Sequence, residues 1–162
     1  MNQIVLVCVI ALVSGTAYSQ KLKETEVPEA IKVSFVKSFP NIKSVKWSKE
    51  SETEFEAEFK SGSVEQSANF DASGKWLVTE TEIKKTDLPP LVQAAIKNEF
   101  DEFKIEEAEK VETVEGVSYE VELEKGEVTY GVQFSKDGKV LKKEEKKEKK
   151  ENDEKEGKDG KD

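Results

Sequence analysis

Two stretches of the chain alternate apolar and acidic residues one by one. Residues 54–59 read Glu-Phe-Glu-Ala-Glu-Phe, and residues 119–124 read Tyr-Glu-Val-Glu-Leu-Glu. Successive side chains of a strand point to opposite faces, so this period of two predicts strands with one buried and one wet face. Similar but weaker patterns predict further strands at 44–49, 64–70, 76–83, 109–113 and 128–134, and from Val140 onward.

A second pattern has a spacing of four residues and predicts two helices. The apolar positions of this pattern are Ile31, Phe35 and Phe39 in one stretch, and Val92, Ile96 and Phe100 in the other. Such a spacing places the apolar side chains on one face of a helix. Pro28 and Pro89 precede the two stripes and suit the first helical turn, where the missing N–H costs nothing.

The two halves of the chain match each other position by position. Tyr119 lies 64 residues after Phe55, and the same offset relates Phe134 to Phe70 and Gly138 to Gly74. This match predicts an α+β chain of two tandem repeats, each of one helix plus about four antiparallel strands. The predicted boundaries are 20–84 for the first repeat and 85–141 for the second.

The two ends of the chain differ from the repeats. Residues 1–19 are expected to be a signal peptide, because Ile4–Val13 is an apolar run too short to span a bilayer, and small residues precede a cleavage site after Ser19. An uncleaved anchor or a buried helix is the alternative. Residues 142–162 lack any apolar residue, which predicts a disordered Lys/Glu tail. The protein is therefore predicted to be periplasmic or secreted, with no stable membrane insertion after cleavage of the signal peptide.

The net charge of −9 belongs to the repeats. The tail from Lys142 onward holds nine lysines and nine acidic residues, so its charges cancel, and the leader has no charged side chain. The 26 basic residues are all lysines. An acidic domain without arginine does not suit a phosphate backbone, so we expect no nucleic-acid partner.

The residue types exclude most catalytic chemistry. There is no histidine, and the only cysteine, Cys8, would leave with the leader. A histidine base, a thiol nucleophile and a zinc site are therefore ruled out, and we expect no enzyme and no cofactor. The strand glutamates could in principle act as an acid–base pair, but a solvated sheet face explains their spacing fully and is the preferred interpretation. Asp71 and Asp137 stand near glycines as in calcium loops, but hairpin turns explain that pattern as well.

Trp47 and Trp76 are the large aromatic residues that could contact a partner. The alternative is that both belong to the core, because Val111 and Val140 occupy the corresponding positions of the second half. Contact with a partner also predicts exposed aromatic or apolar residues on the sheet face turned away from the helices.

Several of these features together resemble a known family. They are the Val-Pro or Leu-Pro helix start, the acidic-alternating Tyr/Phe-Glu-x-Glu strand, and the hairpin in which Gly-Lys precedes Trp76 or Val140. Across residues 27–141 the chain resembles the PepSY-like, beta-lactamase-inhibitor-like domains, which are typically exported proteins of Bacteroidetes-type bacteria. The resemblance implies helices packed on one side of an antiparallel sheet and a concave binding surface.

The resemblance and the residues together predict a function in binding. We expect an exported, non-enzymatic binding or inhibitory module that presents a sheet face to an unidentified protein or peptide in the cell envelope. The alternative is a periplasmic protein that binds a small ligand or calcium.

Overall fold

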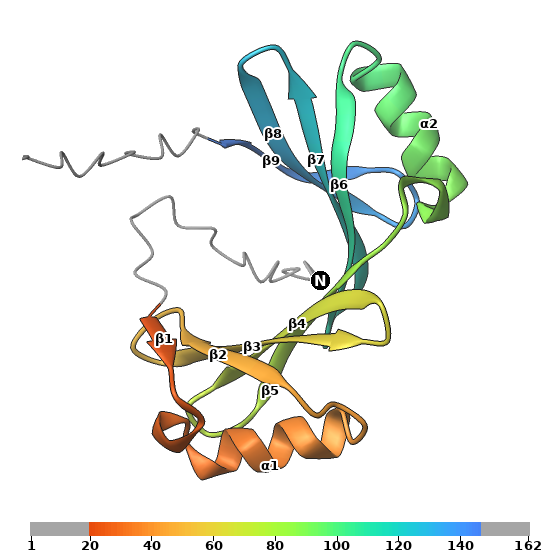
Figure 1. Ribbon diagram of the computed structural model, residues 1–162. Coiled ribbons are helices and arrows are strands. Elements are labelled where there is room, and N and C mark those ends of the chain that lie inside the picture. Colours follow the sequence, from red (N-terminus) through yellow and green to blue (C-terminus); the bar gives the residue numbers. More distant parts are fainter. Residues whose placement is uncertain (1–19, 147–162) are drawn as a thin grey trace, which may run out of the picture. The chain divides into compact units, whose positions relative to one another are not determined.

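The computed structural model describes residues 20–146. The predicted signal peptide and residues 147–162 of the predicted tail lie outside this range. The first part of the chain contains β1 (Gln20–Leu22), the 3-10 turn η1 (Glu24–Glu26), α1 (Glu29–Ser38), β2 (Val45–Lys49), β3 (Glu54–Ser61), β4 (Val64–Asp71) and β5 (Trp76–Glu82) (Figure 1). There follow η2 (Lys85–Asp87), α2 (Pro90–Glu99), β6 (Lys104–Thr113), β7 (Gly116–Lys125), β8 (Val128–Ser135) and β9 (Val140–Lys146).

The predicted fold class, two repeats of one helix plus four strands, is wrong. The strands form a single nine-stranded sheet whose order follows the sequence from β1 to β9, and the two α-helices are short, with ten residues each. The pairs from β1 to β5 and from β7 to β9 are antiparallel. Side-chain periodicity identifies strands but not where a sheet ends, because backbone hydrogen bonds to the next strand decide that.

Strand β1 lies within the predicted bounds of the first repeat but was not among the predicted strands. It pairs with β2 through Gln20 to Leu22, before the first helix begins. Three residues are too few to show a period of two, so no pattern in the sequence predicts this strand.

Contacts divide the chain into two compact units. The first unit extends to Thr81 and also includes Glu112–Gly116, and the second comprises Glu82–Val111 and the described chain from Val117. Each unit has its own hydrophobic core, built from one helix and the apolar positions of its strands.

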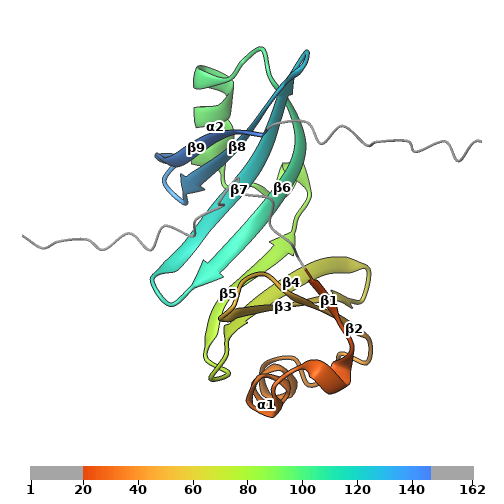
Figure 2. The same cartoon turned by 90° about the vertical axis from the view of Figure 1, so that its left-hand side faces the viewer.

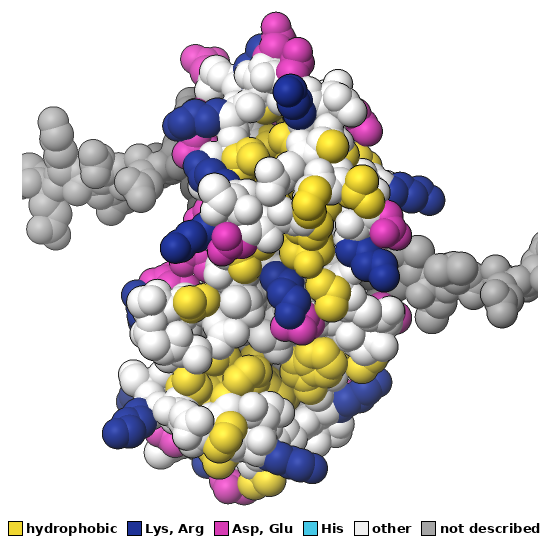
Figure 3. Space-filling model, turned by 90° about the vertical axis from the view of Figure 1, so that its right-hand side faces the viewer, with side chains coloured by type: hydrophobic (Ala, Val, Ile, Leu, Met, Phe, Trp, Pro, Cys, Tyr) yellow, Lys and Arg dark blue, Asp and Glu magenta, His cyan; other side chains and the backbone are white. Residues whose placement is uncertain are grey.

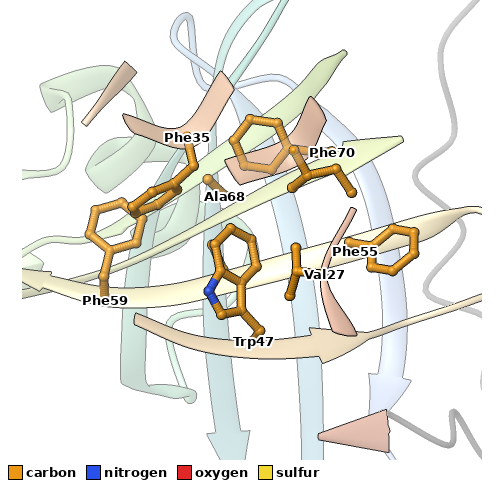
Figure 4. Packing of buried hydrophobic residues seen from close by; sticks show 9 residues of the cluster. Val27, Phe35, Trp47, Phe55, Phe59, Ala68 and Phe70 are labelled. Atoms are coloured by element: carbon orange, nitrogen blue, oxygen red, sulfur yellow. The ribbon is translucent and has the colours of Figure 1, made fainter. Parts of the chain in front are cut away.

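Phe35 of α1 is the central side chain of the first core. Its ring lies edge-on to Trp47 and Phe59, with centroid distances of 5.3 and 5.1 Å, and near Phe70 at 6.4 Å (Figure 4). These strand residues are the apolar members of the alternating pattern. The helix therefore covers the face of β2, β3 and β4 that carries them, as the side views of the ribbon show (Figure 2).

The second core repeats this arrangement with smaller side chains. Val92 and Ile96 of α2 pack with Val121 and Leu123 of β7 and with two residues of β8, Val132 and Phe134. Lys143 of β9 covers the edge of this core, because its ammonium lies 3.8 Å from the ring centroid of Tyr130 and 5.1 Å from that of Phe100. A lysine can shield aromatic surface in this way while its charge stays in water.

A hairpin turn packs closely against each helix, and the residue of the turn nearest the helix backbone is a glycine. Gly74 and Gly138 have φ angles of +85° and +81°. A Cβ on Gly74 would lie 2.6 Å from the carbonyl oxygen of Ala30, and one on Gly138 would lie 2.4 Å from that of Leu91. Both positions therefore require glycine, for the backbone angle and for the space.

The last strand extends into the predicted tail. Strand β9 runs to Lys146, and its register pairs Lys142 with Gln133 and Lys146 with Thr129. Backbone hydrogen bonds to β8 order residues 142–146, although none of these five residues is apolar.

The outer surface is mixed in character. In the view of Figure 3, lysine and carboxylate side chains are interspersed, and apolar side chains are exposed between them. The exposed large apolar residues include Val33 and Val36 of α1 and Leu91 of α2. Scattered exposed apolar side chains of this kind are normal for a folded protein.

Candidate functional site

The face of the first unit's sheet that is turned away from α1 is rich in carboxylates. We call it the acidic face. Its members alternate with the core residues on each strand, and they include Lys21 of β1, Lys46 and Ser48 of β2, Glu50 just after β2, Glu54, Glu56, Glu58 and Lys60 of β3, Glu65, Ser67 and Asn69 of β4, and Val78 and Glu80 of β5.

Strand register places these residues in rows across the sheet. Glu56 of β3 lies opposite Ser48 of β2 on one side and opposite Asn69 of β4 on the other. In the next row, Glu58 and Glu80 lie on either side of Ser67. Directly opposed side chains on one face are within interaction distance, so the carboxylates form a contiguous group.

Short polar side chains connect most of the carboxylates. Asn69 Nδ2 donates a hydrogen bond to Glu54 Oε1 at 2.8 Å, and Ser67 Oγ donates to Glu80 Oε2 at 3.2 Å. The ammonium of Lys60 lies 2.5 Å from Glu65 Oε1, and that of Lys46 lies 3.8 Å from Glu58 Oε2. The side chains of both ion pairs are largely exposed, so these pairs offset little of the negative charge.

Glu56 occupies the centre of the acidic face and has a strongly perturbed titration. Burial and the charge of Glu50 raise the pKa of its carboxyl to about 7, against the hydrogen bond from Ser48, which lowers it. The charges of Glu58 and Glu80 also raise it. A desolvated carboxyl among like charges holds its proton more tightly, because ionisation would add another negative charge to a poorly hydrated group.

On the corresponding face of the second unit, two lysines form ion pairs with carboxylates. Lys146 of β9 pairs with Glu122 of β7 at 2.6 Å, and Lys142 pairs with Glu144 at 3.0 Å. Burial raises the pKa of Glu120 there, while the charges of Lys146 and Lys142 oppose the shift. The carboxylates Glu120, Glu122, Glu124 and Glu144 still outnumber the two lysines of this face, so it also carries negative charge.

The expectation of exposed aromatic residues on this face is wrong for the first unit. Its one apolar member, Val78, is 3% exposed, and the rest are Glu, Lys, Ser and Asn. The aromatic side chains of the first unit lie on the opposite face, where they pack in the core. Any partner of the acidic face must therefore be recognised through charge and hydrogen bonds.

The structure places both candidate tryptophans on the core side of the sheet. Trp47 is 7% exposed and packs against Phe35 (Figure 4). Trp76 pairs with Phe70 in the register, is half-buried at the edge of the core, and donates its indole N–H to Thr79 Oγ1 at 2.8 Å. The core interpretation fits Trp47, and contact of Trp76 with a partner stays a prediction.

Replacing Thr79 with valine should lower the free energy of unfolding by about 1 kcal/mol, because the indole N–H of Trp76 loses its acceptor. Urea unfolding followed by tryptophan fluorescence measures the change. Thr79→Ser keeps the hydroxyl acceptor and is the matched control. A loss in Thr79→Ser with none in Thr79→Val would show that the methyl group of Thr79 matters and the hydrogen bond does not.

The acidic residues do not form a metal site in the described part of the chain. Among residues 20–146, no group of three or more histidine, cysteine, aspartate or glutamate side chains is arranged to hold a metal ion. The Asp71 carboxylate instead accepts hydrogen bonds from the backbone N–H groups of Ser73 and Lys75, which organises the hairpin turn. These bonds fit the turn interpretation of that sequence.

The sequence identified Glu54, Glu56 and Glu58 as a wet strand face but missed their partners. Ser48, Glu50, Asn69 and Glu80 come from three other segments of the chain. Small polar residues on neighbouring strands carry no periodic signal, and only strand register shows that they meet the glutamates.

Comparison with known proteins agrees with the fold and identifies the family. Residues 16–65 and 53–142 match the family described as "Putative beta-lactamase-inhibitor-like, PepSY-like". No curated protein matches the chain. Within residues 20–146 no helix is both long and apolar enough to cross a membrane.

Several solved structures from Bacteroides are similar to this chain. A BLIP-like protein from Bacteroides fragilis is 25% identical with a TM-score of 0.64, and the match covers 75% of this chain and 88% of that one. A DUF2874 family protein from Bacteroides uniformis is 20% identical with a TM-score of 0.69, covering 73% and 88%.

A third structure, described as "putative periplasmic proteins" from Bacteroides eggerthii, is 18% identical with a TM-score of 0.69, and the match covers 74% of this chain and 88% of that one. The matches to the Bacteroides uniformis and Bacteroides eggerthii structures, at 20% and 18% identity, show a similar fold and nothing beyond it. The family match spans most of the chain and confirms the resemblance found in the sequence. The chain therefore belongs to the PepSY-like, beta-lactamase-inhibitor-like family, a membership that fits a non-enzymatic module.

Proposed function

We propose that this protein is an exported, non-enzymatic binding or inhibitory module whose acidic face binds a lysine- or arginine-rich segment of a protein or peptide. The observation that carries the proposal is the acidic face itself. The carboxylates of Glu50, Glu54, Glu56, Glu58 and Glu80 lie on this side of the first unit's sheet, where they outnumber the lysines Lys21, Lys46 and Lys60. A cationic segment is the partner whose charge complements this face.

The arrangement of the face supports binding through surface charge. The carboxylates project from strands, so their spacing is set by backbone hydrogen bonds and needs little reordering when a partner docks. Like charges held together create a potential that accelerates the approach of a cation and weakens as salt is added. Binding should therefore be strongest at low ionic strength.

The compartment is part of the same proposal. A related fold from Bacteroides eggerthii is described as periplasmic, and the leader of this chain is predicted to direct export. The partner would then be a protein or peptide of the periplasm or the cell exterior. The absence of histidine and the loss of Cys8 with the leader support a role without catalysis.

Neutralising the acidic face should weaken the binding of a synthetic lysine-rich peptide. In the triple variant Glu54→Gln, Glu58→Gln and Glu80→Gln, we expect the dissociation constant at low salt to rise about 3- to 100-fold, because an exposed ion pair contributes about 0.2–1 kcal/mol. Isothermal titration calorimetry measures the change. The control variant Glu24→Gln, Glu29→Gln and Glu99→Gln removes equal charge from helical segments and should bind like the unaltered protein.

Equal weakening in both triple variants would show that net charge, and not the acidic face, attracts the peptide. Failure of the unaltered protein to bind the peptide at any salt concentration would contradict the proposal. Calorimetry with calcium alone tests the alternative of a calcium-binding protein. The described residues contain no cluster of metal-ligating side chains that would favour this alternative. Heat at micromolar calcium would support that alternative.

A further inference from the structure

The residue that follows the predicted cleavage site is a glutamine in the first strand of the sheet. Removal of residues 1–19 would make Gln20 the first residue of the mature chain. In the structure Gln20 belongs to β1, where it lies opposite Lys49 of β2 in the register. Cleavage after Ser19 would therefore place a free α-amine on a glutamine at the start of β1.

A glutamine at the N-terminus can react with its own amine. The α-amine nitrogen attacks Cδ of the side-chain amide, so the N–Cδ bond forms and the Cδ–Nε2 bond breaks. Nε2 leaves as ammonia and takes up the proton that the amine gives up. The product is pyroglutamate, an uncharged five-membered lactam. The reaction needs no oxidant, metal or second substrate, and both reacting groups belong to one residue, which favours it.

The other glutamines in residues 20–146 cannot follow this route. Their backbone nitrogens are in peptide bonds and are not nucleophilic amines. The side-chain amides of Gln66, Gln93 and Gln133 also donate hydrogen bonds within the fold, at 2.9, 2.7 and 3.0 Å. Gln20 is exposed, so its amide is accessible to its own amine and to a cyclising enzyme.

The fold around Gln20 accommodates the lactam ring. The ring contains only atoms of Gln20, so the backbone of Lys21 and Leu22 keeps its pairing with Ser48 and Trp47 of β2. Leu22 also packs against the first core, which anchors the strand close to the ring. Strand β1 should therefore remain paired with β2 after cyclisation.

Cyclisation also removes a positive charge from this end of the sheet. An α-amine is largely an ammonium near neutral pH, and in the mature chain it would lie across the strand pair from Lys49. Like charges opposite each other destabilise the pairing of two strands. The neutral lactam has no such repulsion, so it suits the pairing of β1 with β2 better than the free amine does.

We propose that Gln20 is a modification site, at which the mature protein begins and which is converted to pyroglutamate. The inference rests on the predicted export of the chain, and it is independent of the binding of a cationic segment to the acidic face. Aminopeptidases bind a free α-amine, so a chain that begins with pyroglutamate resists them. The modification would thus protect β1 from trimming in the periplasm or outside the cell.

Mass spectrometry of the exported protein tests this inference. The full-length chain is expressed with its own leader in a Bacteroides host, the genus of its structural relatives. We expect the N-terminal peptide to begin at residue 20 and to be lighter than its unmodified mass by one ammonia. The matched control is Gln20→Asn, which keeps a side-chain amide. Its ring would have four members and be too strained to form, so this variant should keep its full mass and a free α-amine.

Three outcomes would overturn the inference. They are a first residue other than Gln20, an N-terminal Gln20 that keeps its full mass, and an equal loss of ammonia from the N-terminal peptide of Gln20→Asn. Hydrogen exchange at Lys21 and Leu22 tests the fit of the ring, and faster exchange in the cyclised protein than in Gln20→Asn would contradict it. None of these measurements uses the lysine-rich peptide, so failure of this inference and failure of the proposed function can be told apart.

Discussion

Replacing Phe35 with alanine should lower the free energy of unfolding by about 3–5 kcal/mol. The side chain is 3% exposed and lies at the centre of the first core, where its ring contacts Phe39, Trp47 and Phe59. Removal of the ring leaves a cavity between the helix and the strands, and the surrounding aromatic rings cannot collapse into it without leaving their own partners. Edge-to-face contacts between aromatic rings add to the loss.

Urea unfolding followed by tryptophan fluorescence measures this effect directly, because both tryptophans lie in the first unit. The matched control is Val36→Ala, the next residue of the same helix. Val36 is 62% exposed, so its truncation should change the free energy by less than about 0.5 kcal/mol. A small effect of Phe35→Ala, close to that of Val36→Ala, would show that the helix contributes little to the stability of the first unit.

Replacing Gly138 with alanine should cost about 2–5 kcal/mol. The backbone φ angle of +81° is unfavourable for a residue with a Cβ by about 1–2 kcal/mol. The new Cβ would also lie 2.4 Å from the backbone oxygen of Leu91 and 2.9 Å from its carbonyl carbon. Because both groups belong to the main chain, the hairpin or helix α2 must move, at a cost of about 1–3 kcal/mol.

Gly126→Ala separates the two causes. Gly126 has a similar φ angle of +63°, but a Cβ there meets no atom within 4 Å. We expect it to cost only the backbone term, about 1–2 kcal/mol. Urea unfolding followed by circular dichroism, together with hydrogen exchange of α2, measures both variants. Equal losses at the two positions would show that the hairpin does not press against the helix.

Much of the secondary structure could be predicted from the sequence. The period of two identified β3 and β7, and the spacing of four identified α1 and α2, because these elements each bury one face. The register and extent of the sheet could not be predicted. Strand β1 has only three residues, too few to show a period. Strand β9 continues through lysines and glutamates to Lys146, and its pairing with β8 orders these residues although they bury no apolar side chain.

The candidate site was predicted only in part. Glu54, Glu56 and Glu58 were recognised as the wet side of a strand, but the wet side was expected to display aromatic residues as well. In the structure Trp47 and Trp76 lie on the core side, because each is in register with a core residue, Ala57 and Phe70. Residue type does not show which face a side chain occupies in a strand with weak alternation.

The sequence by itself determined the family, the alternating strands, the two helix stripes and the absence of histidine chemistry, because these depend on residue identity and local spacing. The tertiary structure decided how the strands join into one sheet and which glutamates become neighbours. It brings Ser48, Glu50 and Glu56 together through pairing of β2 with β3, and burial in that setting raises the pKa of the Glu56 carboxyl. Such a property depends on desolvation and on charges from other strands, and neither is encoded at a fixed distance along the chain.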